Sequence, residues 1–280
     1  MPPCFPGAAR RRFNLTMLLL IAMLAAALHL LAGGLLFLRL IHGTARVTGR
    51  GLPLGLAAVA ALLHAVVVWS AVWTPVGLNL GFFNALAVVS LFMVVGMLLA
   101  TSRLPVCHLG VILLPISAFS VLMACTPDCG TVVPREPGVD LHILTSMLGY
   151  STLALAAIQA LILAALDYRL RHRRMGGFVR RLPALNTMEQ QLFGMLWLGF
   201  ALLSVGLLTG LVFVDDLLAQ HLVHKTTLSV VAWVVFGTLL VGRWRLGWRG
   251  QTAVRWTLGG FAALMLAYFG SKFVLELLLA

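Results

Sequence analysis

Charged side chains are scarce in this sequence. Only 10% of its 280 residues are Asp, Glu, Lys or Arg, against about 25% in soluble domains. Hydrophobic residues make up 61% of the chain, and the mean hydropathy is +1.03. Apolar runs of 19 to 27 residues recur along nearly the whole length. This pattern excludes a soluble globular protein, a disordered chain, a disulfide scaffold and a coiled coil, and it predicts an all-α polytopic membrane protein.

Acidic residues are scarcer still than basic ones. Eight Asp and Glu face twenty Lys and Arg, which gives a formal net charge of +12. In a soluble protein this balance would suggest a nucleic-acid partner. Here the basic residues lie in short loops between apolar runs, so membrane topology explains them better. The expected partner is the lipid bilayer, and nucleic acid is not expected.

About 20 apolar residues are needed to cross the hydrocarbon core, and on this measure the chain forms one bundle of eight transmembrane helices. The predicted spans are Met17–Leu40, Leu54–Trp73, Leu80–Thr101, Leu104–Cys125, Leu141–Asp167, Met188–Val214, His224–Gly242 and Trp256–Ala280.

Basic residues occupy every second connection, which predicts the orientation of the bundle because cytoplasmic loops carry an Arg and Lys excess. Fourteen arginines follow spans 1, 3, 5 and 7, whereas the alternate connections hold Arg135 and Lys225 with five acidic residues. We therefore expect both termini on the periplasmic side of a bacterial inner membrane. The fourteen are Arg39, Arg46, Arg50, Arg103, Arg169, Arg171, Arg173, Arg174, Arg180, Arg181, Arg243, Arg245, Arg249 and Arg255.

The segment 1–16 conflicts with this orientation, because Arg10, Arg11 and Arg12 would have to cross the membrane. A basic leader or an artificially extended start would each explain it. The segment shows no hydrophobic periodicity, and Met17 opens the first apolar run directly. We favour Met17 as the true start, with residues 17–280 forming a single domain.

Histidines are the main candidates for chemistry, since ionisable side chains are costly in hydrocarbon and are often functional there. His29 and His64 lie in the middle of spans 1 and 2, and His108 lies near the inner start of span 4. His142 and His224 begin spans 5 and 7 at the external side. At 1.5 Å per residue, His64 lies ~15 Å from the inner end of its span. Two sites, or one site and a structural His, therefore fit better than one shared ion.

Two imidazoles from separate helices, with an apolar wall and little acid nearby, suit a non-covalent b-type haem better than zinc. The predicted cofactor-binding residues are His64, His142 and His224, with His142 and His224 as axial ligands of the iron. Cys125 and Cys129 form a CxxxC at the external end of span 4. A disulfide and two unpaired thiols are about equally consistent with it. The sequence contains no recognised catalytic motif, so we do not expect an enzyme.

Three segments resemble the cytochrome c assembly protein family, and most closely its HemX/YpjD-like branch. They are HKTTLS from His224, GRWRLGWRG from Gly242, and AYFGS from Ala267. The run LHILTSMLGYSTLALAAIQA from Leu141 is similar to the helix that carries an external haem-ligating His in CcsA and CcmC proteins, and His142 matches that ligand. The resemblance implies an eight-span fold with external termini and a role in haem handling.

The chain departs from the haem-delivery members of this family at three places. It lacks the tryptophan-rich segment before His224, it has Val241 at about the position of a membrane His, and its last helix has no external His. We therefore expect a haem-binding protein of cytochrome c assembly or haem supply without the haem-presentation segment. Other cytochrome assembly or haem-pathway membrane proteins are candidate partners. A non-haem accessory or structural membrane subunit is the alternative, and a small-molecule transporter comes third.

Overall fold

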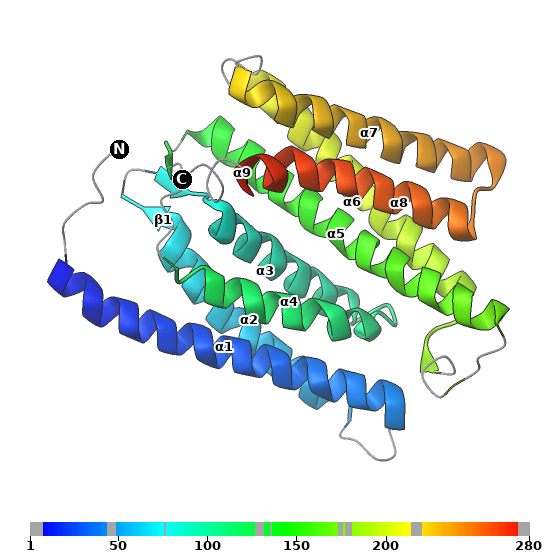
Figure 1. Ribbon diagram of the computed structural model, residues 1–280, viewed down its shortest axis with the longest axis horizontal. Coiled ribbons are helices and arrows are strands. Elements are labelled where there is room, and N and C mark those ends of the chain that lie inside the picture. The colour runs from blue at the N-terminus through cyan, green and yellow to red at the C-terminus, as the bar shows by residue number, and fades with distance from the viewer. Residues whose placement is uncertain are drawn as a thin grey trace.

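The computed structural model describes residues 8–43, 49–75, 77–126, 132–134, 136–172, 176, 181–213 and 220–273. Within these ranges only the backbone is described at residues 8–14, 220–224 and 271. Helices dominate the described chain, so the all-α membrane class is confirmed (Figure 1). The main helices are α1 (Ala8–His42), α2 (Gly51–Val72), α3 (Phe82–Ala100), α4 (Gly110–Met123), α5 (Pro137–Arg171), α6 (Leu185–Phe213), α7 (Gln220–Leu246) and α8 (Gly250–Met265).

The eight helices alternate in direction through the bundle. In Figure 1, α1, α3, α5 and α7 end at the same end of the molecule, where α2, α4, α6 and α8 begin. The first described helix begins and the last one ends at the opposite end. At the first of these ends, the Arg50 side chain donates to the carbonyl of Thr101, and Arg181 donates to the carbonyls of Leu40 and Ile41. We call it the basic end, and the opposite one the terminal end.

Helix is the expected state for these segments, because a backbone in hydrocarbon must satisfy its polar groups internally. Seven of the helices among the described residues are long and apolar enough to cross a membrane. The fourth predicted span is shorter than expected. Its helical part runs over Cys107–Met123, with a 3₁₀ turn at Cys107–Leu109. Pro105 in the preceding loop lacks a donor for a helical hydrogen bond, which is consistent with the late start.

Helix α1 reaches back to Ala8, so the backbone of residues 8–16 is helical where the sequence suggested an aperiodic leader. At the basic end α7 continues to Leu246 and α8 begins at Gly250, so that the predicted boundaries at Gly242 and Trp256 were wrong. Both helices extend through arginine-bearing turns, since long cationic side chains can direct their charges into the interface.

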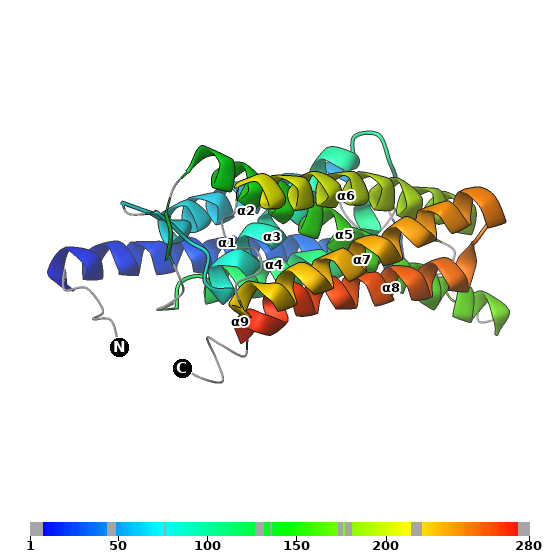
Figure 2. The same cartoon turned by 90° about the horizontal axis from the view of Figure 1, so that it is seen from above.

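The bundle has two halves that meet along α3 and α5. In one half, α1 packs against α2 and α4, and α3 packs against α2 and α4. In the other, α5 packs against α6 and α8, and α7 packs against α6 and α8. Figure 2 shows α6 on one face of this second half, with α7 and α8 on the other. Helices α6 and α8 both lie between α5 and α7 in this packing order, so α7 does not pack along the length of α5.

Glycines allow α5 and α6 to approach closely. A Cβ at Gly206 would lie 3.0 Å from Ser146 Oγ, and a Cβ at Gly149 would lie 3.2 Å from the Leu203 nitrogen. The GxxxG of Gly206 and Gly210 therefore serves packing within the bundle in this structure.

A small sheet at the terminal end was not predicted from the sequence. Strands β1 (Trp73–Thr74), β2 (Gly77–Asn79) and β3 (Val132–Val133) pair antiparallel in the order β1-β2-β3. Leu78 pairs with Trp73 on one side and Val133 on the other. A Cβ at Gly77 would lie 2.2 Å from the Val133 carbonyl oxygen, so only glycine permits this pairing.

Helix α8 changes character before it ends. A π-helical turn spans Leu266–Gly270 and is followed by the short α9 (Ser271–Phe273). Such wide turns interrupt the regular hydrogen-bond ladder and often occur at functional sites.

Candidate functional site

His142 lies on α5 near the terminal end and contacts α6. Its Nδ1 is 2.8 Å from the Gly206 carbonyl oxygen. Since a carbonyl only accepts, Nδ1 carries the proton and Nε2 keeps its lone pair. The ring also packs against Gly210, where a Cβ atom would lie only 2.9 Å from His142 Cε1. Gly210 therefore makes room for the His142 ring and the Gly206 carbonyl fixes its tautomer, which is the usual preparation of a metal-ligating imidazole.

His224 lies in the first turns of α7, at the same end of the bundle as His142. Its side chain lies outside the described residues. Helix α7 packs against α6, and α6 in turn carries the His142 contact. The two predicted axial ligands thus lie near the beginnings of two helices that both pack against α6.

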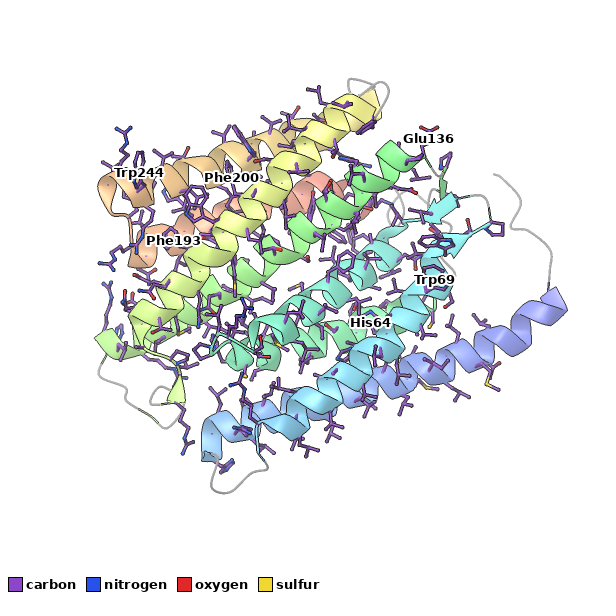
Figure 3. All side chains as sticks on the ribbon, turned by 180° about the vertical axis from the view of Figure 1, so that it is seen from behind. His64, Trp69, Glu136, Phe193, Phe200 and Trp244 are labelled. Carbon is purple, nitrogen blue, oxygen red and sulfur yellow. The ribbon has the colours of Figure 1, made fainter. Side chains whose placement is uncertain are left out.

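His64 lies elsewhere, in the half formed by α1 to α4 (Figure 3). It is fully buried, and so is His29 on α1. The two rings meet edge to face with their centroids 5.6 Å apart. Among the described residues none of the four ring nitrogens has a hydrogen-bond partner. The structure therefore pairs His64 with His29 and places it apart from His142.

The environment of this pair is an alanine-rich core. Ala25, Ala26 and Ala32 on α1 and Ala60 and Ala61 on α2 are buried on either side of the two histidines. The sequence placed His29 and His64 at similar depth but did not predict their contact. Knowing that α1 and α2 are antiparallel neighbours would have suggested it, because each histidine lies near the middle of its helix.

An aromatic groove runs between α6 and α7. Its volume is about 640 Å³, and Trp197, Phe200, Trp233 and Trp248 are among its lining residues. Figure 3 shows Phe200 on α6 directed toward α7, where its ring stacks on Trp233 with a centroid distance of 5.4 Å. Val241 also lines this groove. At the position where the resembling family places a membrane His, this chain therefore has an apolar side chain, Val241, in the wall of the groove.

Several buried polar residues that the sequence analysis did not identify lie in other helices. Gln159 and Gln191 form a buried hydrogen-bonded set with His108. Glu189 is buried and accepts from the Gly250 nitrogen at 2.8 Å. Lys272 is buried at the terminal end, where it donates to the Leu80 carbonyl. The sequence signal that could have found them is an amide or charged side chain inside an apolar run. Burying such a side chain in hydrocarbon costs free energy, as burying a histidine does.

The structure describes only part of the residues on which the cysteine and metal predictions depend. Cys125 follows α4, whereas Cys129 lies outside the described residues, so the disulfide stays a prediction. No group of three or more His, Cys, Asp or Glu in the described part of the chain could hold a metal ion. A site built on two imidazoles does not need such a group, because the porphyrin supplies four ligands.

The comparisons with known proteins agree with the resemblance seen in the sequence. The family described as "Cytochrome C assembly protein" matches residues 54–279. The chain is 36% identical to the inner membrane protein YpjD of Escherichia coli over 211 residues, which cover 72% of this chain and 77% of that relative. It is 23% identical to the cytochrome c biogenesis protein CcsA of Guillardia theta over 191 residues, or 59% of this chain and 64% of that one.

A further relative is an uncharacterised 28.8 kDa protein of Azospirillum brasilense, 35% identical over 60% of this chain and 63% of its own length. No solved structure matches significantly. The family match covers most of the chain, including α5, α7 and α8, on which the resembling motifs lie. The chain therefore belongs to the cytochrome c assembly protein family.

Proposed function

We propose that this chain is a haem-binding protein of a bacterial inner membrane that acts in cytochrome c biogenesis or in haem supply or its regulation. Family membership supports the general role, and one relative carries the name cytochrome c biogenesis protein. The observation that carries the haem proposal is the hydrogen bond between His142 Nδ1 and the Gly206 carbonyl. It leaves Nε2 with a lone pair at the end of the bundle where the resemblance puts a haem ligand.

The residues around His142 fit an axial ligand of a b-type haem. A neutral imidazole with its other nitrogen bonded to a carbonyl is held in one orientation, and its basicity as a ligand is raised. The ring is half-buried, so it is reachable without unfolding of the bundle. We propose His224, which lies in the first turns of α7, as the second residue that would hold the haem iron, because α7 also packs against α6. Bound haem would supply its iron for redox chemistry or serve as cargo.

His64 has a separate or supporting role in this proposal. It belongs to the α1–α4 half and pairs with His29, whereas His142 contacts α6. We propose binding rather than catalysis, with cytochrome assembly or haem-pathway membrane proteins as partners. The fourteen arginines that follow spans 1, 3, 5 and 7 support a periplasmic location of both termini.

Absorption spectroscopy of protein purified from haem-replete cells tests the proposal. We expect a Soret band and low-spin visible bands in the wild type, and altered bands or lost haem in His142→Ala and His224→Ala. His64→Ala should leave the spectrum largely intact. His172→Ala is the matched control, because His172 also bonds a carbonyl through Nδ1 (that of Tyr168, at 2.8 Å) but is exposed at the basic end. Loss of the bands only in His64→Ala would move the site to the bundle interior, and absence of haem from the wild type would refute the proposal.

The second candidate function is a non-haem accessory or structural membrane subunit that retained the fold. The observation that favours it is Val241, which lines the aromatic groove where the resembling family has a membrane His. Under this alternative, purification from haem-replete cells yields a folded protein without a Soret band, together with a co-purifying membrane partner.

A further inference from the structure

The aromatic groove between α6 and α7 leads to an arginine at the basic end. On α7 its lining residues Val234, Thr238 and Val241 recur at helical spacing, so they form one stripe along the helix. Arg245 follows Val241 by one helical turn and extends this stripe to the basic end. Its side chain is exposed, and its Cζ lies 4.8 Å from the centre of the Trp244 ring.

A second arginine lies at the same mouth of the groove, on the side of α6. Phe193 precedes the lining residues Trp197 and Phe200 on one face of α6, the face that Figure 3 shows directed toward α7. The Cζ of Arg243 lies 4.6 Å from the centre of the Phe193 ring. Arg243 Nη1 also donates to the carbonyl of Trp248, another lining residue, at 3.3 Å. The groove therefore ends between two guanidinium groups.

The positive charges at this mouth are not neutralised within the described part of the chain. Asp167 and Glu189 are the acidic residues that the structure describes at the basic end, and each already pairs with another arginine, at 3.1 and 3.4 Å. Arg243 and Arg245 have no carboxylate partner among the described residues. Guanidinium groups bind phosphate oxygens with good geometry. The mouth is therefore complementary to an anionic phosphate group.

The body of the groove is open to the hydrocarbon and has the length of one leaflet. Trp197 is 56% exposed and Val241 is 57% exposed, on spans that would cross the membrane. From Val234 to Leu246 the lining extends over about 18 Å at helical rise. One leaflet supplies half of a hydrocarbon core of about 30 Å. An acyl chain that starts at the arginines would therefore fill the groove along its length.

The lining distinguishes this occupant from others. The residues that line the groove, all within the part of the chain that the structure describes, include no His, Cys, Met or Tyr, so a haem iron would find no axial ligand there. A free phosphate ion would leave the apolar groove unused, and a zwitterionic lipid would leave the arginines without a net counter-charge. A lipid that combines an acyl chain with a net negative headgroup uses both parts.

We propose that the aromatic groove binds an anionic phospholipid, with one acyl chain along α6 and α7 and the phosphate at Arg243 and Arg245. The contacts on the protein side are aromatic and aliphatic in the groove and charge-assisted at its mouth. The proposal uses neither His142 nor His224, so it can fail or hold independently of the proposed haem binding.

Native mass spectrometry of the full-length protein tests the headgroup preference, after incubation in detergent with equal amounts of phosphatidylglycerol and phosphatidylethanolamine. We expect the wild type to retain phosphatidylglycerol about tenfold over phosphatidylethanolamine, which corresponds to roughly 1.4 kcal/mol. The double variant Arg243→Gln and Arg245→Gln should bring this ratio close to one. The matched control is Arg103→Gln with Arg255→Gln, which removes the same charge from exposed positions of the basic end outside the groove. It should change the ratio less than twofold.

A second pair of variants tests the position of the acyl chain. A Cβ at Gly237 would lie 3.4 Å from Phe200 Cε2, an ordinary contact, so Gly237→Leu should place its side chain in the groove and reduce the retained phosphatidylglycerol about tenfold. Gly259→Leu is the control, since Gly259 is exposed on α8 outside the groove and a Cβ there meets nothing within 4 Å. This pair keeps the test decisive if the double arginine variant does not fold.

Four results would overturn the proposal. Equal retention of the two lipids by the wild type would remove the headgroup preference. Equal effects of the two double arginine variants would assign the preference to the general charge of the basic end. Unchanged binding in Gly237→Leu would place the chain elsewhere. Displacement of the lipid by equimolar haemin, or by inorganic phosphate, would identify a haem site or a simple anion site instead.

Discussion

The imidazole of His29 on α1 meets that of His64 on α2 edge to face, with an interplanar angle of 80°. The ring nitrogens have no hydrogen-bond partner among the described residues. A buried polar atom without a hydrogen-bond partner costs about 1–3 kcal/mol in an apolar core. The pair therefore reduces the stability of the folded state unless a ligand, a water molecule or a proton uses it.

Replacing both histidines tests this cost. We expect the double variant His29→Leu and His64→Leu to raise the free energy of unfolding by about 1–3 kcal/mol, because apolar side chains of similar volume remove the unsatisfied groups. Thermal melting in detergent measures the change. A lower melting temperature in the double variant would show that the pair makes stabilising interactions, for example with a bound ion or water.

Gly210 makes room for the His142 ring, and this contact can be tested against an open glycine. In Gly210→Ala the new Cβ would lie 2.9 Å from His142 Cε1, so the ring must shift and its bond to the Gly206 carbonyl is strained. We expect a loss of about 1–2 kcal/mol. Gly34→Ala, where the Cβ meets nothing within 4 Å, should instead gain about 0.5–1 kcal/mol from the lower entropy of the unfolded chain. The same direction of change in both variants would contradict the packing argument.

Much of the fold was predictable because hydrophobic length and charge asymmetry are local properties. The spans of α2, α3, α5 and α6 follow directly from apolar runs of membrane length. Contacts between spans were not predictable, since they depend on which helices are neighbours. His29 with His64, and Gln159 with Gln191, are pairs of this kind.

Short elements and helix ends were the other failures. The pairing of Leu78 with Trp73 and Val133 joins segments too short to show an alternating pattern. The α7–α8 turn was misplaced because its two glycines with positive φ, Gly247 and Gly250, lie inside an arginine-rich stretch that resembles a loop. The motif predicts His142 as a haem ligand, which stays a prediction, and its bond to Gly206 required the structure.

Glu189 ties that turn to α6, and its removal should destabilise the basic end. Its Oε1 accepts from the Gly250 nitrogen at 2.8 Å, and its Oε2 lies 3.4 Å from Arg249 Nε. Glu189→Leu leaves the partly buried Gly250 N–H without an acceptor, so we expect the free energy of unfolding, measured by thermal melting, to fall by about 1–2 kcal/mol. Glu189→Gln keeps an acceptor oxygen and should lose less than half of that. Equal losses would assign the effect to the charge rather than to the hydrogen bond.

Reporter fusions test the orientation of the bundle. Fusions after Asp140 and after Arg174 should report opposite compartments, periplasmic for the first and cytoplasmic for the second. The reason is the excess of arginine at the end of the bundle where α5 finishes. Activity of both reporters in the same compartment would refute the alternating topology.

The two ends of the bundle are closed by different forces. At the terminal end the strands β1, β2 and β3 join the α2–α3 connection to the segment before α5 through backbone hydrogen bonds, which ionic strength hardly affects. At the basic end, arginine side chains reach carbonyls and carboxylates across loops. Charged contacts at a surface weaken with salt and compete with anionic lipid headgroups. Salt and lipid composition should therefore loosen one end of the molecule alone, so that anionic lipid headgroups can tune the loops of the basic end while the terminal end keeps its shape.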